Sequence, residues 1–484
     1  MNATRRYPRP GSLIPALALG LFLSSGFLVA GCISQQPADE ATYILATGRR
    51  LPYVYVIPLD RALDPTNNDT PNAILTRNKV ALDRLDGQLL GDPANLAISE
   101  DGGTAYIVNH HGGIDNAEFT QHGGRGQIAV LDIDEMLKPE NDRTANALGW
   151  HLDTGGFGAV GLLLLQDMLI ISNAENNLTE NGGNRVTFID RQTGSLRGTV
   201  ELALGNPGFD CPEYPVPFSS PHGPPADLAV LSPDPSWGCF PDNNGLALGR
   251  GADGEAYVFT ANGGTGDVSV IDLRRALEGD SRAEIHRVPT QTGPWGITAT
   301  PDGRYVIAAS RESQQIAFEG NTVSIIDVDL ARVGSDDAEV ARVLVGTDDP
   351  SEETRPFIPS VTPDGSEVIV PNFRANNVSI VDLEMALAGD PDAEVARIPL
   401  TREDGRPARP KGSAITSDGR YAVISAGPSG GRGVRDSLDP ESFGRGEEIF
   451  VDGHVYVIDL SSRSIAGVVT GVGNDPYGLG ILDR

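Results

Sequence analysis

Residues 294–310 read PWGITATPDGRYVIAAS, and residues 321–327 read NTVSIID. The first segment contains an apolar strand, an Asp-Gly turn and a second apolar strand. The second segment is a third strand, which ends in Asp327. Asp-Gly favours the tight reversal of a β-hairpin because glycine tolerates positive φ. Together the two segments predict three consecutive antiparallel strands.

The same pattern recurs along the chain. A close copy has its turn at Asp364-Gly365 and its third strand at 377–382, NVSIVD. An Asp closes the third strand of six copies: Asp132, Asp190, Asp272, Asp327, Asp382 and Asp459. The third strands are rich in β-branched residues, which suit sheets that neighbouring sheets cover on both faces. The recurrence therefore predicts one closed repeat architecture in place of several separate domains.

Short helical segments follow several third strands. The segments 60–63, 272–280 and 382–390 each begin with an Asp, and the last two end near a Gly. Such segments are typical of capped helical turns. We interpret them as spacers between the third and fourth strands of a unit.

The two ends of the chain supply the parts of one further unit. Residues 476–481, PYGLGI, predict an inner first strand with no strand after it. Residues 43–46, 54–57 and 73–75 predict the strands that it lacks. Six complete units and this divided one predict an all-β fold over residues 41–484, a seven-bladed β-propeller closed by N- and C-terminal strands in one blade. Closure of this kind removes open sheet edges.

The repeats resemble those of the YVTN family of β-propellers. In that family an Asn lies seven residues beyond the turn Gly, as Asn109 follows Gly102 and Asn372 follows Gly365 here. The corresponding positions of three other copies hold Ala261, Ser310 and Ala426. The second copy has Gln166-Asp167 where the others have Asp-Gly. The resemblance implies a propeller of the lactonase-like or surface-layer type, and it leaves function open because propellers host unrelated activities.

The N-terminus has the features of a bacterial lipoprotein leader. Arg5, Arg6 and Arg9 precede an apolar segment, 13–30, which ends in a lipobox-like LVAGC at Cys32. We therefore predict a signal peptide over 1–31, a lipid on Cys32 and a linker over 32–40, so that a lipid anchors the chain to the membrane. No Asp follows Cys32, which favours the outer membrane. The alternatives are an ordinary signal peptide and a short anchor helix.

The charge balance excludes one class of partner. The chain carries 37 basic and 66 acidic residues, a net charge of -29. A charge this negative argues against nucleic acid as a partner. It suits a highly charged protein whose partners are cations or basic surfaces, or it reflects solubility alone.

Two cysteines remain after the leader, Cys211 and Cys239. They bracket a stretch, 207–241, that is dense in Pro, Gly and Ser. An exported protein meets an oxidising compartment, so we predict a disulfide between them. Two free thiols are the alternative.

Long insertions are predicted to gather on one face. In a propeller the second-to-third and fourth-to-first loops return to the same side, here called the top face. The insertions at these positions are 110–126, 174–184, 311–320, 427–453 and the stretch 211–239. Long loops on a rigid scaffold commonly carry binding residues. The top face is therefore the predicted site for an unknown protein or small-molecule ligand.

Two candidate metal sites lie within these loops. His110, His111 and His122 are close in sequence, and imidazoles of this kind bind Zn or Cu. Asn173 and Glu175 offer oxygen ligands of the kind through which lactonase-type propellers hold Ca, so the resemblance implies a possible calcium site. The alternatives are solvation for the histidines and turn formation for the asparagines.

Further candidates lie at the predicted channel mouth. Two are the asparagines of the repeat, and four stand just before inner strands. The set is Asn109, Asn372, Trp295, Phe357, Lys411 and Tyr477. They either contact a ligand or pack between blades.

No catalytic motif is present in the sequence. It lacks a Gly-x-Ser-x-Gly elbow, a phosphate loop, a His-Glu-x-x-His zinc motif and a haem-attachment motif. This favours a binding or scaffold lipoprotein of the cell envelope with no catalytic residues. A lactonase-like hydrolase, a quinoprotein-like oxidoreductase and a periplasmic metal-binding protein remain as alternatives.

Overall fold

The structure, a computed structural model, consists mostly of antiparallel β-sheets. It describes residues 41–48, 53–82, 91–111, 125–138, 147–175, 184–203, 241–312, 318–427 and 452–484. All of them belong to the unit Ala41–Arg484. The strands form six sheets, as expected for a propeller-like all-β fold. The predicted leader, the linker 32–40, Cys32, Cys211 and Cys239 lie outside the described residues.

Four of the sheets contain four strands each, in chain order. The first consists of β11 (Asn243–Arg250), β12 (Ala256–Asn262), β13 (Asp267–Asp272) and β14 (Glu284–Pro289). The second consists of β15 (Gly293–Ala299), β16 (Tyr305–Glu312), β17 (Thr322–Asp327) and β18 (Glu339–Leu344). The third consists of β19 (Ser360–Val361), β20 (Glu367–Asn372), β21 (Asn377–Asp382) and β22 (Glu394–Pro399). The fourth consists of β23 (Pro410–Ile415), β24 (Tyr421–Ala426), β25 (His454–Asp459) and β26 (Ser464–Thr470).

A fifth sheet joins the two ends of the described unit. Its strands are β27 (Pro476–Asp483), β1 (Thr42–Gly48), β2 (Tyr53–Pro58) and β3 (Val80–Ala81), in that order. Strand β27 pairs antiparallel with β1, so the C-terminal strand is the inner strand of this sheet, as the sequence predicts. The predicted fourth strand was misplaced. Residues 73–75 form turns, in which Leu75 donates its N–H to Val56 O (2.9 Å), and β3 follows five residues later.

The sixth sheet has seven strands because one strand belongs to two repeats. In chain order these strands are β4 (Gly91–Ile98), β5 (Thr104–His111), β6 (Arg125–Asp132), β7 (Leu148–Leu165), β8 (Met168–Glu175), β9 (Arg185–Asp190) and β10 (Leu196–Glu201). The first half of β7 pairs with β6 and its second half pairs with β8. Gly155 and Gly158, at φ 75° and 59°, allow the strand to bend between the halves. The turn between β7 and β8 has no Asp-Gly, and Gln166 takes the left-handed position there, at φ 51°.

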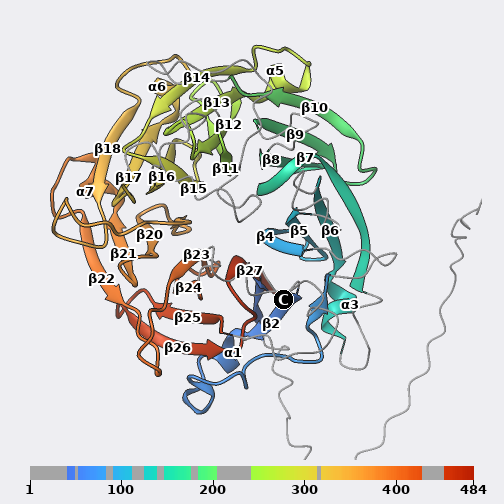
Figure 1. Ribbon diagram of the computed structural model, residues 1–484, viewed down its shortest axis with the longest axis vertical. Helices are drawn as coiled ribbons and strands as arrows, with labels where there is room; N and C mark the ends of the chain where they lie inside the picture. Colours follow the sequence, from blue (N-terminus) through green and yellow to red (C-terminus); the bar gives the residue numbers. More distant parts are fainter. Residues whose placement is uncertain are drawn as a thin grey trace, which may run out of the picture. The chain divides into compact units, whose positions relative to one another are not determined.

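The sheets stand in a ring (Figure 1). The first strand of each repeat contacts the first strand of the next, in a closed circuit of β27, β4, β7, β11, β15, β19, β23 and again β27. The hydrophobic cores lie between adjacent sheets. One core, for example, joins Phe259 and Val270 to Val306 and Ile326 of the next sheet. This arrangement explains why the strands are apolar on both faces.

The predicted helical spacers are present after the third strands. They are α1 (Leu59–Ala62), α5 (Leu273–Leu277) and α7 (Leu383–Leu387). Two helices that were not predicted, α3 (Ile133–Leu137) and α6 (Val328–Ala331), follow other third strands, and a 3-10 turn, η1, spans Pro65–Asn67. The recurring Asp caps four of these helices. Asp132, Asp272, Asp327 and Asp382 each accept the backbone N–H three residues on. Helix α1 is the exception, because Pro58 precedes it and no side chain caps it.

Sheet order fixes where the insertions lie. The segments 112–124, 176–183, 313–317 and 428–451 connect second strands to third strands, and 204–240 connects a fourth strand to the next first strand. The described strand ends on either side of these segments lie at the end of the sheets away from the Asp-Gly turns, the end called the top face above. Among the described residues, no helix has the length and apolar character needed to cross a membrane.

Candidate functional site

A repeated turn leads into the inner strands on the top face. In three repeats the residue before a Pro has a left-handed backbone: Arg355 (φ 53°), Arg409 (φ 59°) and Asp475 (φ 55°). Non-glycine residues adopt this region only when the surrounding structure compensates for the strain. The residues two positions further on are Phe357, Lys411 and Tyr477, so the turn fixes where each of these side chains lies.

The predicted aromatic residues come together in one buried cluster. Phe357 contacts Trp295, Phe373 and Tyr477, with ring centroids 6.0, 5.9 and 5.5 Å away. All four side chains are buried. Their arrangement is that of packing between repeats, which the sequence left open as an alternative. Phe373 completes the cluster and was missed, although it directly follows the predicted Asn372.

Lys411 forms a buried ion pair with Asp475. Both side chains are almost fully inaccessible, at 0% and 3% exposure. The Lys411 ammonium also donates to Gly427 O (3.2 Å). Asp475 directly precedes β27, so the pair joins the last complete repeat to the strand that closes the ring. The position of Lys411 is therefore structural in the first instance.

Asn372 of the YVTN pattern, and Asn262 in another repeat, connect the second strand to the third. Asn372 Nδ2 donates to Asn377 Oδ1 (2.8 Å) and Ser379 Oγ (2.7 Å). Asn262 makes the equivalent bonds to Asp267 and Ser269, at 2.6 and 2.7 Å. The sequence placed Ala261 at this position, which is wrong by one residue because the turn before β12 is longer.

The proposed metal ligands are only partly described. Asn109, His110 and Asn173 are buried at the top ends of β5 and β8. The side chains of His111 and Glu175, and all of His122, lie outside the described residues. Within the described ranges no three His, Cys, Asp or Glu side chains could hold a metal ion together. The two metal sites therefore stay predictions.

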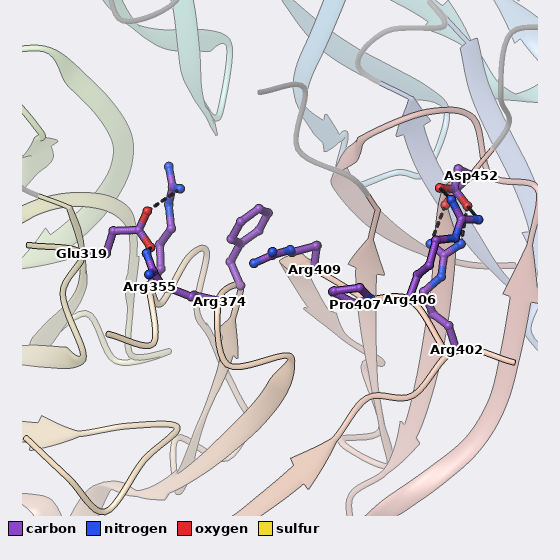
Figure 2. Close-up of a pocket in the computed structure, with 9 residues that line it drawn as sticks. Glu319, Arg355, Arg374, Arg402, Arg406, Pro407, Arg409 and Asp452 are labelled. Atoms are coloured by element: carbon purple, nitrogen blue, oxygen red, sulfur yellow. Dashed lines mark hydrogen bonds and ion pairs between the residues drawn. The ribbon is translucent and has the colours of Figure 1, made fainter. Parts of the chain in front are cut away.

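A pocket of about 640 Å³ opens among loops of the top face (Figure 2). Arginines dominate its described lining: Arg355, Arg374, Arg402, Arg406 and Arg409. Phe373, Pro407, Glu319 and Asp452 complete it. Every one of these residues lies in a second-to-third or fourth-to-first connection. So many guanidinium groups in one pocket are unexpected in a chain of net charge -29.

Carboxylates hold two of the arginines on one side of the pocket. Arg355 Nη1 donates to Glu319 Oε1 (2.9 Å), and Arg374 Nη1 donates to Glu319 Oε2 (2.8 Å). Arg374 also lies 2.9 Å from Glu353. These residues come from three different loops, so the ion pairs fix the loops against one another.

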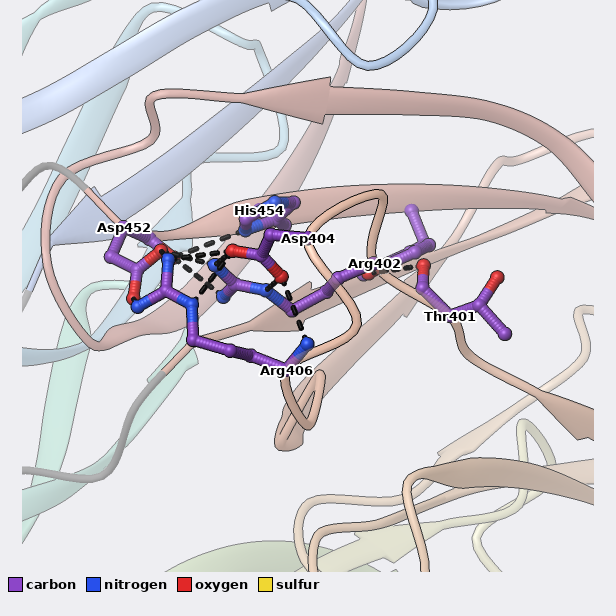
Figure 3. Close-up of polar contacts among 7 residues, drawn as sticks. Thr401, Arg402, Asp404, Arg406, Asp452 and His454 are labelled. Carbon is purple, nitrogen blue, oxygen red and sulfur yellow. Dashed lines mark hydrogen bonds and ion pairs between the residues drawn. The ribbon is translucent and has the colours of Figure 1, made fainter.

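A second ion-pair cluster forms the other side (Figure 3). Arg402, with a side chain only 3% exposed, pairs with Asp452 and lies 2.9 Å from Asp404. Arg406 lies 2.6 Å from Asp404 and 3.0 Å from Asp452. The hydrogen bond from Arg402, followed by that from the Arg406 backbone, holds the pKa of Asp404 well below its usual range. His454 lies beside this cluster. Burial lowers its pKa, and the charge of Arg402 acts in the same direction.

Arg409 lies between the two clusters (Figure 2). Its guanidinium carbon is 5.0 Å from the centre of the Phe373 ring, in a cation–π arrangement. Within the part of the chain that the structure describes, no carboxylate pairs with this guanidinium. Burial, opposed by Glu319 and assisted by Arg355 and Arg374, lowers the pKa of Arg409.

The pocket lies at the predicted top face, but most of its lining comes from connections other than the predicted insertions, and none of the predicted site residues belongs to its described lining. The arginines went unnoticed because each was read singly. A usable signal exists in the segment 402–409, REDGRPAR, which places three arginines in one fourth-to-first loop of an acidic chain.

No protein-family model matches the chain, and no curated protein matches it. Solved structures do. A candidate 6-phosphogluconolactonase of Bacteroides fragilis is 13% identical, with a TM-score of 0.53, over 93% of this chain and 100% of the other. The periplasmic gluconolactonase of Pseudomonas aeruginosa is 15% identical, with a TM-score of 0.53, over 91% and 99%. A protein of unknown function from Desulfotomaculum acetoxidans has a TM-score of 0.51 at 13% identity, over 91% and 98%. At these identities the similarity is one of fold.

Proposed function

We propose that this protein is a ligand-binding lipoprotein of the bacterial cell envelope. Its fold is a seven-bladed propeller of the YVTN type, in which β7 contributes a strand to each of two blades. It carries a lipid on Cys32, a disulfide between Cys211 and Cys239, and its binding site on the top face. The circuit of contacts between first strands and the closure of the ring by β27 support seven blades. The lipobox-like segment supports a lipid anchor on Cys32.

One observation carries the binding function. The arginine pocket is lined, in its described part, only by connections of the top face. Carboxylates from neighbouring loops hold four of its arginines in place. A surface built in this way is preorganised, which reduces the entropy lost when a ligand binds.

Hydrolysis of a lactone is the second candidate. Two structural neighbours have lactonase in their names. A hydrolase needs a group that takes a proton from water. Glu319 and Asp452 each face two arginines, so the described carboxylates of the pocket serve as ion-pair partners. This arrangement favours binding over hydrolysis.

Hydrogen exchange on the full-length mature protein, extracted from membranes, tests the binding face. The probes are three mixtures: small organic anions, neutral oligosaccharides and basic peptides. We expect one mixture to slow exchange in the loops 345–359 and 400–409. Slower exchange confined to the Asp-Gly turns would refute a top-face site. Turnover of δ-gluconolactone above the uncatalysed rate would favour the hydrolase.

The anchor and the disulfide have separate tests. Replacing Cys32→Ser should remove a diacylglycerol-sized mass and release the protein from membranes. Equal fractionation of variant and wild type as soluble protein would contradict the anchor. Thiol labelling under denaturing conditions should find Cys211 and Cys239 unreactive until a reductant is added.

A further inference from the structure

Arg409 is held in position by features of its own backbone and of its neighbours. Its φ of 59° is left-handed, and Pro410 follows it. Its N–H donates to Asn376 Oδ1 (3.0 Å), and its guanidinium lies over the Phe373 ring. The left-handed turn recurs at Arg355 and Asp475, so it belongs to the repeat, whereas the bond to Asn376 and the contact with Phe373 are what set the place of Arg409.

The charges around the pocket are almost, but not fully, balanced. Arg355, Arg374, Arg402 and Arg406 each pair with at least one carboxylate. Those carboxylates are Glu319, Glu353, Asp404 and Asp452. Five guanidinium groups thus face four carboxylates among the described residues. The remaining positive charge is that of Arg409, at the centre of the lining (Figure 2).

We propose that the pocket binds a small organic molecule through a single carboxylate, and that Arg409 receives this carboxylate. The proposal rests on the proposed function and names its ligand class. A guanidinium presents parallel N–H groups that match the two oxygens of a carboxylate. The pocket is larger than a carboxylate group alone, so it also holds the body of the ligand beside Phe373 and Pro407.

The excess of one charge selects against dianions. A phosphate monoester carries about −1.5 to −2 charges at pH 7. Binding one would leave the pocket negative within a chain of net charge -29. A carboxylate neutralises Arg409 and leaves the two ion-pair clusters undisturbed. Partial burial of Arg409 adds to the preference, because a half-desolvated cation gains more from an anion than an exposed one does.

The test uses three probes with one six-membered ring: cyclohexanecarboxylate, cyclohexyl phosphate and cyclohexanol. Isothermal titration on the mature full-length protein should give a Kd of about 1 mM or lower for the carboxylate. We expect the phosphate to bind more weakly and cyclohexanol not to bind. Replacing Arg409→Gln should weaken carboxylate binding about tenfold or more, since hydrogen bonds to charged groups are strong. Arg409→Lys should fall between, because it keeps the charge and loses the planar fork.

The matched control is Arg420→Gln. This substitution removes the same charge from the same sheet. Arg420, however, lies at the turn end of β24, and its side chain is 60% exposed. Its carboxylate binding should equal that of the wild type. Circular dichroism and melting curves establish that each variant is folded, and Arg409→Lys answers the question if Arg409→Gln does not fold.

Three results would overturn the proposal: equal carboxylate affinity in the Arg409 variants and the wild type, phosphate binding as tight as carboxylate binding, or no heat from the carboxylate. None of these refutes the proposed function. Slower exchange of the top-face loops with another probe mixture would preserve it, and slower exchange at the opposite end of the sheets would remove it.

Discussion

The two ends of the sheets use their carboxylates differently. At the turn end, Asp302, Asp364 and Asp418 accept hydroxyl hydrogen bonds from Thr300, Thr362 and Thr416, each two residues earlier, at 2.5 to 2.6 Å. At the pocket end Asp404 also bonds locally, but Glu319 and Asp452 accept from arginines that are 36 to 55 residues away. Because the bonds at the turn end are local, the same turn recurs from sheet to sheet. Because bonds at the pocket end join distant loops, the structure there differs between repeats. A surface that differs between repeats is the one suited to a specific ligand.

Deletion of the closing strand, β27, is expected to have the largest effect. Removing residues 476–484 takes away the inner strand of one sheet, exposes the edge of β1 and removes the packing against β4 and β23. We expect the melting temperature to fall by many degrees or the cooperative transition to disappear. An unchanged melting curve would show that the ends of the described unit are not needed for closure.

The buried ion pair at the pocket end should have the next largest effect. Replacing Lys411→Met leaves Asp475 buried without its cation, so we expect a loss of about 3–5 kcal/mol of unfolding free energy. Chemical denaturation measures it. The double variant Lys411→Met with Asp475→Asn should recover part of the loss, because it removes the uncompensated charge as well.

A substitution at the turn end should change the stability only slightly, and the change should depend on pH. Thr416→Val removes one hydroxyl donor to Asp418, so we expect a loss of about 1 kcal/mol at pH 7. That hydrogen bond is the main cause of the lowered pKa of Asp418. A carboxyl whose pKa is lowered by folding stabilises the folded protein at pH values above its unfolded-state pKa, near 4. This stabilisation disappears as the pH falls through the folded-state pKa. The gap between wild type and variant should therefore narrow in acid, leaving the part that comes from the Tyr421 N–H losing Thr416 Oγ1 as its acceptor; a gap that widens below pH 4 would contradict this.

The smallest effect is expected for an exposed arginine of the pocket. Arg374→Gln should change the unfolding free energy by less than about 1 kcal/mol, since its side chain is 50% exposed and water screens its ion pairs. Thermal melting beside Arg420→Gln measures the difference. A large loss would mean that water does not screen these ion pairs as their exposure suggests, and that they contribute substantially to stability.

The comparison also explains what the sequence could and could not predict. Asp-Gly turns, helix caps and the terminal pairing depend on neighbouring residues or on periodicity, and the structure contains them. Asn262 was missed by one position because a single extra turn residue shifts the count. The pocket depends on the meeting of Arg355, Arg409 and Asp452, which no local pattern records. His111, His122 and Glu175 stay untested as ligands, because their side chains lie outside the described residues.

Strand β7 has a mechanical consequence. Elsewhere a connection separates one repeat from the next, and neighbouring sheets share side-chain packing and a few backbone hydrogen bonds, such as that from the Ile358 N–H to Lys411 O (3.0 Å). Strand β7 instead pairs with β6 through its first half and with β8 through its second half, with register shifts near the bend between the halves. The two repeats thus share one sheet, so we expect them to move together, and a ligand that shifts neighbouring repeats apart should act between the other sheets.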